Sequence, residues 1–137
     1  MLHIREGCYQ FMIQDALRRL PNEACGLLSG RKNLAESFFA MKNTEESPAS
    51  YLMDPKEQFH VMKHIRERNE EMLAIYHSHV ASPAYPSSKD VQLAFYPDVY
   101  YVLISLQDRS HPVVKAYRIQ EGKVREEPFK VAPEESR

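Results

Sequence analysis

The stretch MLAIYHSHVASPAYPSSKD, residues 72–90, predicts a strand, a loop and the start of a helix, in that order. Residues 72–79 begin with an apolar run that is typical of a buried strand. On a strand, residues i and i+2 point to the same face, so His77 and His79 converge while Ser78 faces away. On a helix, the same spacing would place the two imidazoles roughly opposite each other.

Asp90 is a third candidate donor. We expect it on the first turn of a short helix that runs from Ser87 to about Phe95, and the loop of residues 80–86 can bring it back over the strand end. Catalytic zinc sites typically combine three protein ligands with a water. Two imidazoles and one carboxylate suit Zn²⁺, and the absence of a nearby cysteine favours a catalytic over a structural site.

Ser87 and Asp90 also have a purely structural interpretation. A serine followed three positions later by an acidic residue forms a capping box, in which Ser87 is the N-cap of the helix. We expect that a carboxylate committed to a metal does not also serve as a simple cap, so the two interpretations are alternatives.

A zinc site that activates water needs a base to accept a proton. Glu23 stands at the start of the apolar stretch ACGLLSG, residues 24–30, so its carboxylate could reach the end of a neighbouring strand. Glu70 and Glu71 stand at the far end of the histidine strand, and we expect them to point to solvent. Spacing alone favours Glu23 only weakly and leaves other glutamates open.

The rest of the chain predicts an α/β fold with a mixed, mostly antiparallel sheet and about three helices. Residues 9–20 have apolar residues at helical spacing and end before Pro21, and a second helix follows Asp54 as its N-cap, with Phe59, Met62 and Ile65 on its inner face. Further strands are expected at residues 2–5, 24–30, 34–41, 99–106, 113–120 and 124–131.

Composition narrows the class of protein. The 137 residues have the length of one domain, and 43% hydrophobic with 27% charged residues is typical of a globular protein. A net charge of −1 gives no indication of a nucleic-acid or membrane partner. The first residues lack the order of a signal peptide, so we expect a cytoplasmic location.

The remaining cysteines and histidines have ordinary interpretations. Cys8 and Cys25 form no CxxC pair, and we expect buried free thiols. His60 and His64 have the spacing of an HExxH motif, but Val61 occupies the place of its glutamate. We expect these two histidines on a solvated helix face.

The complete pattern resembles the JAMM (MPN+) metallopeptidases, whose motif is a glutamate followed much later by His-x-His-x7-Ser-x2-Asp. Here the motif reads His77, His79, seven residues, Ser87, two residues and Asp90. PNEACGLLSG, residues 21–30, is similar to the family's stretch with the catalytic glutamate, which maps to Glu23, and YLMDPKEQF, residues 51–59, adds to the similarity. The resemblance covers most of the chain up to about residue 106.

The resemblance implies an αβα sandwich of cytidine-deaminase-like type. We expect one domain over residues 1–131, and the stretch APEESR, residues 132–137, is expected to be a disordered tail. The resemblance also implies one Zn²⁺ per chain, held by His77, His79, Asp90 and a water. Glu23 would be the general base and then the proton donor to the leaving amine, and Ser87 would donate a hydrogen bond to the oxyanion.

The chain looks like the compact prokaryotic members, some of which process ubiquitin-like sulfur-carrier proteins that end in Gly-Gly. The resemblance therefore implies hydrolysis of the amide after that tail, which would enter a groove beside the zinc as an added strand. A short chain has little room for the segments with which eukaryotic relatives hold polyubiquitin. The oligomeric state does not follow from the sequence.

Two other functions remain open. One is a non-catalytic interaction domain of the same fold, although such members usually lack part of the motif. The other is a zinc hydrolase or deaminase that acts on small molecules, but the PCxxC stretch of the usual deaminases is absent.

Overall fold

The computed structural model describes residues 1–134. Eight strands of the described residues form one sheet in the order β7-β6-β5-β4-β2-β3-β1-β8. The strands are β1 (Leu2–Arg5), β2 (Cys25–Arg31), β3 (Leu34–Met41), β4 (Glu71–His79), β5 (Tyr100–Ser105), β6 (Val113–Gln120), β7 (Lys123–Glu127) and β8 (Phe129–Ala132). The helices are α1 (Glu6–Arg18), α2 (Pro55–Glu67) and α3 (Ser88–Gln92).

The sheet is mixed. β1 pairs in parallel with β3 and β8, and β4 pairs in parallel with β5, whereas the other four pairings are antiparallel. The prediction of an α/β fold with a mixed sheet and three helices is therefore confirmed for residues 1–134. No helix in this range is long and apolar enough to cross a membrane.

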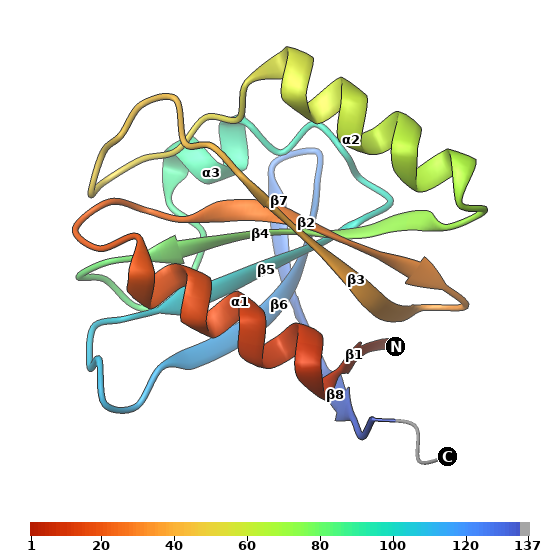
Figure 1. Ribbon diagram of the computed structural model, residues 1–137. Helices are drawn as coiled ribbons and strands as arrows, with labels where there is room; N and C mark the ends of the chain where they lie inside the picture. Colours follow the sequence, from red (N-terminus) through yellow and green to blue (C-terminus); the bar gives the residue numbers. More distant parts are fainter. Residues whose placement is uncertain (135–137) are drawn as a thin grey trace.

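Helices cover both faces of the sheet (Figure 1). α1 packs on one face through Cys8, Met12 and Ala16, which join a cluster with residues of β1, β4 and β5. α2 and α3 lie over the other face, where Ile65 and Val91 pack against a second cluster from β2, β4 and β5. Each central strand thus contributes alternate side chains to two cores.

β4 lies inside the sheet, between β2 and β5. Its Ile75 joins the core under α2, whereas Tyr76 joins the core under α1 and donates a hydrogen bond of 2.7 Å to Asp15. By the same alternation His77 and His79 face the α2 and α3 side. Ser78 faces away, as predicted, and accepts the Ala24 N–H at 2.8 Å.

α2 begins as expected. The Asp54 side chain accepts the Lys56 N–H at 2.9 Å, and Pro55 occupies the first turn. On its inner face Met62 and Ile65 pack against the sheet, but the prediction for Phe59 was wrong, because that ring is 66% exposed.

Two element boundaries differ from the prediction. α1 begins at Glu6, directly after β1, and not at residue 9. α3 ends at Gln92 and is capped by Leu93, so it is shorter than the expected helix to about Phe95.

The predicted strand at 124–131 is two strands that lie at opposite edges of the sheet. β7 pairs with β6, and β8 pairs with β1. Pro128, between them, has no N–H to donate to a ladder, so the pairing of β7 ends there. Pro128 is the only residue between β7 and β8, so residues 123–132 form one continuous segment that lies behind the central strands in Figure 1. Its first half pairs with β6 and its second half with β1, which brings the two ends of the strand order together.

Residues 132–134, expected in a disordered tail, have defined contacts. Ala132 pairs with Arg5 at the end of β8, and the Pro133 carbonyl accepts a hydrogen bond of 2.8 Å from Arg5. The Glu134 carboxylate accepts the Gly7 N–H at the start of α1. Residues 135–137 of that expected tail lie outside the described residues.

Candidate metal centre

The three predicted donors meet at the end of β4. His77 Nε2 and His79 Nε2 lie 3.2 Å apart, and each lies 3.0 Å from Asp90 Oδ2. Ligand atoms at zinc bond lengths in a tetrahedral site are separated by roughly 3.3 Å. The three atoms therefore fit a single zinc-sized ion, and within residues 1–134 they are the one such group of His, Cys, Asp or Glu donors.

The ring of His79 is oriented through its other nitrogen. Its Nδ1 lies 2.8 Å from the Pro83 carbonyl oxygen. A carbonyl only accepts, so the proton of the neutral ring is on Nδ1 and the Nε2 lone pair faces His77 and Asp90. This is the tautomer that a metal ligand bound through Nε2 requires.

His77 is held by packing. It is 1% exposed, and the Tyr51 ring stacks on it with 4.4 Å between ring centroids. Its Nδ1 is buried without a hydrogen-bond partner among the described residues. Burial lowers the pKa of His77, so the ring is neutral at neutral pH, which is the form that binds metals.

Asp90 combines two roles that we expected to exclude each other. Its Oδ2 accepts the Ser87 N–H at 2.8 Å, and Ser87 Oγ accepts the Asp90 N–H at 3.1 Å, which completes a capping box. The same Oδ2 faces both imidazoles. A carboxylate oxygen has more than one lone pair, so one atom can accept the cap N–H and still face the two imidazoles.

The charge of Asp90 is well stabilised. Burial raises the pKa of its carboxyl, but the contacts with His77 and His79 and the Ser87 N–H outweigh burial and hold the pKa well below its usual range. Burial also opposes the charging of His79, yet its contacts with Asp90 and Pro83 raise the pKa of that ring. Asp90 is thus an anion at the centre of the cluster.

Glu23 is placed beside this cluster by the pairing of β2 with β4. Cys25 pairs with His77, so Glu23, two residues earlier, stands opposite the end of β4 near His79. Its backbone N–H donates to the Ser47 carbonyl at 2.9 Å, and its carbonyl accepts from the Asn43 side chain at 3.1 Å. The loop of residues 43–50 thereby fixes the position of this glutamate.

The Glu23 carboxyl is buried and has a free oxygen. The residue is 4% exposed, and Oε1 has no hydrogen-bond partner among the described residues. Burial raises the pKa of Glu23 to about 8, although the electrostatic effect of nearby His79 opposes this increase. A carboxyl that titrates near neutral pH can both accept and return a proton.

A cavity of about 280 Å³ lies between Glu23, His79 and Ser87. It is lined by Glu23, Pro48, Ala49, His79, Ala81, Ser82 and Ser87. Ser87 Oγ accepts a hydrogen bond from Asp90 N–H, which leaves its own O–H free to donate. The structure therefore brings all five predicted site residues to one place.

Other predicted side chains lie elsewhere or have structural roles. Cys8 and Cys25 are buried free thiols, as predicted, and burial raises the pKa of each to about 12. His60 and His64 are exposed on α2, as predicted. The prediction for Glu70 was wrong, because its carboxylate is buried and accepts a 2.7 Å hydrogen bond from Ser29.

Two contributors to the site were not predicted. Tyr51 stacks on His77, and the Pro83 carbonyl orients His79. The similarity at residues 51–59 singled out the segment of Tyr51 but not its contact. The role of Pro83 could not be found from residue types, because the group that acts is a backbone carbonyl.

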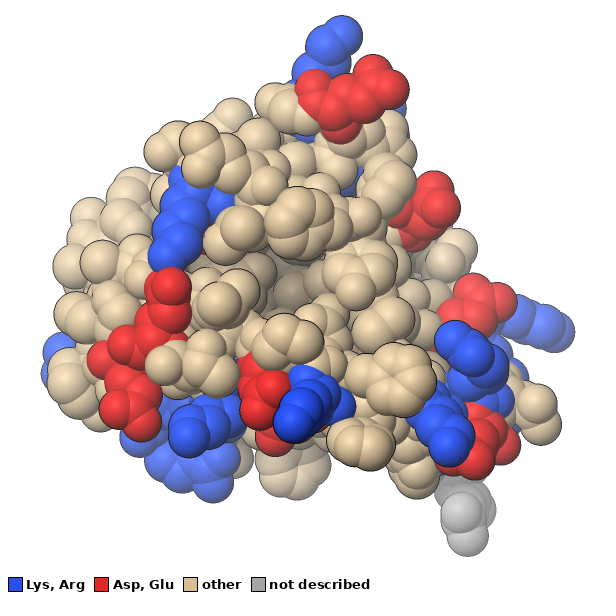
Figure 2. Space-filling model, turned by 90° about the horizontal axis from the view of Figure 1, so that it is seen from above, with Lys and Arg blue, Asp and Glu red and all other residues tan. Residues whose placement is uncertain are grey.

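The α2 and α3 side of the molecule has a hollow in a surface without charged side chains, and charges of both signs lie around it (Figure 2). A second cavity, of about 190 Å³, opens on this side between α2 and the segment after α3, and Tyr51 lines it. The floor of that cavity includes Ile75, two residues before His77 on the same face of β4.

Helices on both faces of a mixed sheet, with two imidazoles, an aspartate and a buried glutamate around the end of β4, are typical of a metal-dependent hydrolase. Residues 5–120 match the family described as prokaryotic homologs of the JAB domain. The chain belongs to this family, so the predicted compact prokaryotic JAMM/MPN+ type is confirmed.

Comparisons with individual proteins agree. The CysO-cysteine peptidase of Mycobacterium tuberculosis is 41% identical over 133 residues, which cover 96% of this chain and 91% of the relative. A probable TtuB-protein conjugate cleaving protease of Thermus thermophilus is 32% identical over 123 residues, which cover 89% of this chain and 78% of the relative. The solution structure of protein DSY2949 from Desulfitobacterium hafniense superposes with a TM-score of 0.89 at 38% identity and covers 98% of this chain and 94% of that one. The chain is a hydrolytic enzyme of the JAMM type.

Proposed function

We propose that this protein is a zinc-dependent isopeptidase that hydrolyses the amide bond after the C-terminal Gly-Gly of a ubiquitin-like or sulfur-carrier protein. The observation that carries the proposal is the meeting of His77 Nε2, His79 Nε2 and Asp90 Oδ2 within 3.2 Å, beside the unpaired carboxyl oxygen of Glu23. The names of two relatives, which describe a CysO-cysteine peptidase and a TtuB-conjugate protease, support this class of substrate.

His77, His79 and Asp90 would hold one zinc ion per chain. When bound, zinc polarises a carbonyl and lowers the pKa of a coordinated water to about 7. Glu23 takes a proton from the attacking water and passes it to the leaving amine, for which a pKa near 8 is suited. Ser87 donates its free hydroxyl proton to the oxygen that becomes negative in the transition state.

The carrier tail would enter a groove beside the zinc as an added strand, and β4 itself is not the partner of that strand. β4 is hydrogen-bonded to β2 on one side and to β5 on the other, so neither of its edges can accept a further strand. The tail would reach the cavity lined by Glu23 and Ser87 from the α2 and α3 side of the sheet, where His77 and His79 face. Residues 1–131 would form the single catalytic domain, with a fold related to that of the cytidine deaminases.

The experiment is to incubate the zinc-loaded protein with small Gly-Gly carriers of its host that bear C-terminal amino-acid or peptide adducts, and to read the product masses. We expect a carrier ending in free Gly-Gly and the released amine. Glu23→Gln should lower kcat by at least a hundredfold with one zinc per chain retained. Full activity of Glu23→Gln would remove this residue from the mechanism.

Two further measurements separate the alternatives. Cleavage of none of the carriers, together with hydrolysis of small amides or nucleosides, would support a small-molecule zinc hydrolase instead. Metal analysis that finds no zinc in protein purified without chelator would contradict the metal assignment itself. Glu46→Gln, which changes an exposed carboxylate in the neighbouring loop, is a matched control that should keep full activity.

A further inference from the structure

Three successive carbonyl groups in the loop after β4 each accept a hydrogen bond from the protein. The Ser82 carbonyl accepts from Ser105 Oγ at 2.7 Å, and the Ala84 carbonyl accepts from the Tyr117 hydroxyl. Between them, the Pro83 carbonyl accepts from His79 Nδ1 and from the Tyr85 N–H, both at 2.8 Å. The carbonyl that orients the histidine is therefore flanked by two anchored neighbours.

Both anchors come from the sheet. Ser105 ends β5 and pairs directly with His79 across the β4–β5 ladder, and Tyr117 lies on β6. Each residue is 3% exposed. The histidine and the two hydroxyl groups thus belong to one sheet, whereas the three carbonyls that accept from them are consecutive groups of one loop.

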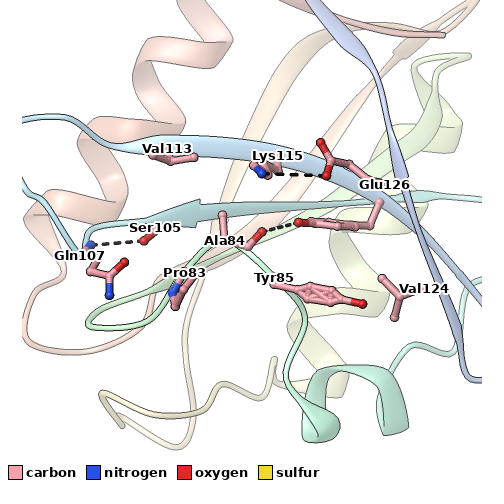
Figure 3. Close-up of a pocket in the computed structure, with 10 residues that line it drawn as sticks. Pro83, Ala84, Tyr85, Ser105, Gln107, Val113, Lys115, Val124 and Glu126 are labelled. Carbon is pink, nitrogen blue, oxygen red and sulfur yellow. Dashed lines mark hydrogen bonds and ion pairs between the residues drawn. The ribbon is translucent and has the colours of Figure 1, made fainter.

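The loop borders a cavity on its outer side. Pro83, Ala84 and Tyr85 line a cavity of about 450 Å³, and β6 and β7 form the opposite wall through residues that include Val113, Lys115, Val124 and Glu126. Figure 3 shows the loop across this cavity from β6, with the hydrogen bond from Tyr117 to Ala84 at its edge. Ala81 and Ser82, just before, line the cavity of the metal centre.

We propose that Ser105 and Tyr117 are positioning residues for the metal centre, because they hold the loop at the place where the Pro83 carbonyl fixes the ring of His79. For an imidazole that binds through Nε2, an acceptor for the Nδ1–H fixes the tautomer and the orientation of the ring. Of the two histidines His79 has such an acceptor among the described residues, whereas His77 is held by packing. Loss of either hydroxyl leaves a loop carbonyl without its donor, so the loop shifts toward the open cavity and the acceptor of His79 shifts with it. This inference rests on the proposed zinc site.

The test is zinc affinity, measured on the full chain by competition with a chromogenic chelator. Outer hydrogen-bond partners of metal ligands typically contribute 10–100-fold to metal affinity. Ser105 and Tyr117 act through one further group, so we expect Ser105→Ala and Tyr117→Phe each to lower affinity by roughly 3- to 10-fold, and the double variant by roughly 10- to 100-fold.

Two control variants distinguish positioning from general damage. Ser105→Thr keeps the hydroxyl in a strand position and should restore most of the affinity that Ser105→Ala loses. Tyr85→Phe removes a hydroxyl from the same cavity, where the Tyr85 ring lies edge-on to Tyr117, and should leave affinity unchanged. The visible spectrum of the cobalt-substituted protein should change in Ser105→Ala and Tyr117→Phe, and match wild type in Tyr85→Phe.

Zinc affinity within twofold of wild type in both Ser105→Ala and Tyr117→Phe would overturn the inference. An equal loss in Tyr85→Phe or in Ser105→Thr would overturn it as well, since the effect would then not follow the hydroxyl groups. Should Tyr117→Phe fail to fold, the pair Ser105→Ala and Ser105→Thr decides the question alone. Failure of the proposed zinc site is distinguishable, because wild-type protein would then bind no zinc. Failure of the proposed carrier substrate is also distinguishable, because it would leave these zinc affinities unchanged.

Discussion

Glu23 carries the least satisfied charged group of the site. Its carboxyl is buried beside another anion, Asp90, and one of its oxygens has no partner among the described residues. Burial without compensation penalises the ionised form. The residue therefore remains protonated in the folded, metal-free protein at pH values where it is ionised in the unfolded chain.

This difference makes the stability of the metal-free protein depend on pH. The pKa of Glu23 rises from about 4.5 to about 8 on folding, so below pH 4.5 both states are protonated and no penalty exists. Between these two values only the unfolded state ionises, and the free energy of unfolding falls as pH rises, by at most about 1.4 kcal/mol per pH unit. Glu23→Gln cannot ionise and should escape this loss.

Urea unfolding in the presence of chelator at pH 5, 6.5 and 8 checks this prediction. With each increase in pH, the free energy of unfolding of Glu23→Gln should rise relative to that of wild type. The exposed Glu46→Gln should show no such change relative to wild type. A constant difference between Glu23→Gln and wild type over this range would show that Glu23 ionises normally in the folded state.

At the residue scale the sequence predicted the site better than its surroundings. The spacing of His77 and His79 predicts convergence as soon as β4 is a strand, and the motif indicated Asp90, Ser87 and Glu23. The contacts of Tyr51 and Pro83 depend on how two loops fold over the sheet. Residue types carry no such information, because any residue has a carbonyl that can accept from His79.

At the scale of elements, β2 determines how closely its neighbours approach. Gly26 pairs with Tyr76 of β4, and the Tyr76 ring lies over it and reaches Asp15 of α1. A Cβ at Gly26 would come within 2.3 Å of both the Phe39 carbonyl oxygen and the Tyr76 ring. The contact of α1 with β4 thus depends on the absence of one side chain.

Gly26→Ala should therefore destabilise the fold. Overpacking of a core typically costs about 1–3 kcal/mol, and here one of the clashing atoms belongs to the backbone, so we expect the upper part of this range. Equilibrium urea unfolding measures the effect. A stability equal to that of wild type would mean that β3 and Tyr76 move aside freely.

Gly122→Asn is the matched control. Gly122 has a φ of 77° in the turn between β6 and β7, and nothing lies within 4 Å of a Cβ built there. Asparagine tolerates the left-handed region, so this variant should change stability by less than about 0.5 kcal/mol.

Helices and strands that are defined by their own residues were predicted from the sequence. Elements whose bounds depend on the strands with which they pair were not. Asp54 and Pro55 predict the start of α2, and the apolar run before His77 predicts β4. The start of α1 at Glu6 was missed because Gly7 is a poor helix former. The split at Pro128 was missed because the exposed residues of β7 and β8 read as one strand, while their partners, β6 and β1, are far apart in the sheet.

At the scale of the whole molecule, the proposed metal would strengthen the connection between the short helix α3 and the sheet, which otherwise consists of a loop and the packing of Val91. His77 and His79 belong to the centre of the sheet, and Asp90 belongs to α3, whose other contacts are few because the helix has five residues. A bound ion would therefore link α3 to both cores through β4.

Removal of zinc should lower thermal stability. A ligand present at a hundred times its dissociation constant stabilises a protein by about 2.7 kcal/mol, which for a chain of this size corresponds to roughly 5–10 °C in Tm. Differential scanning calorimetry with zinc and with chelator measures the shift. Asp90→Ala should show no zinc-dependent shift, and an identical Tm of wild type under both conditions would contradict the site.

The passage of the chain from β7 to β8 has a consequence for biosynthesis. Both outer positions of the sheet are filled by residues 123–132, so β6 and β1 each keep an unpaired edge on a ribosome-bound chain until this short segment has emerged. Unpaired edges invite association between chains. Translation that stalls before codon 123 would therefore release a polypeptide with two unpaired edge strands. Chaperones and proteases would then have to keep this polypeptide from aggregating or degrade it.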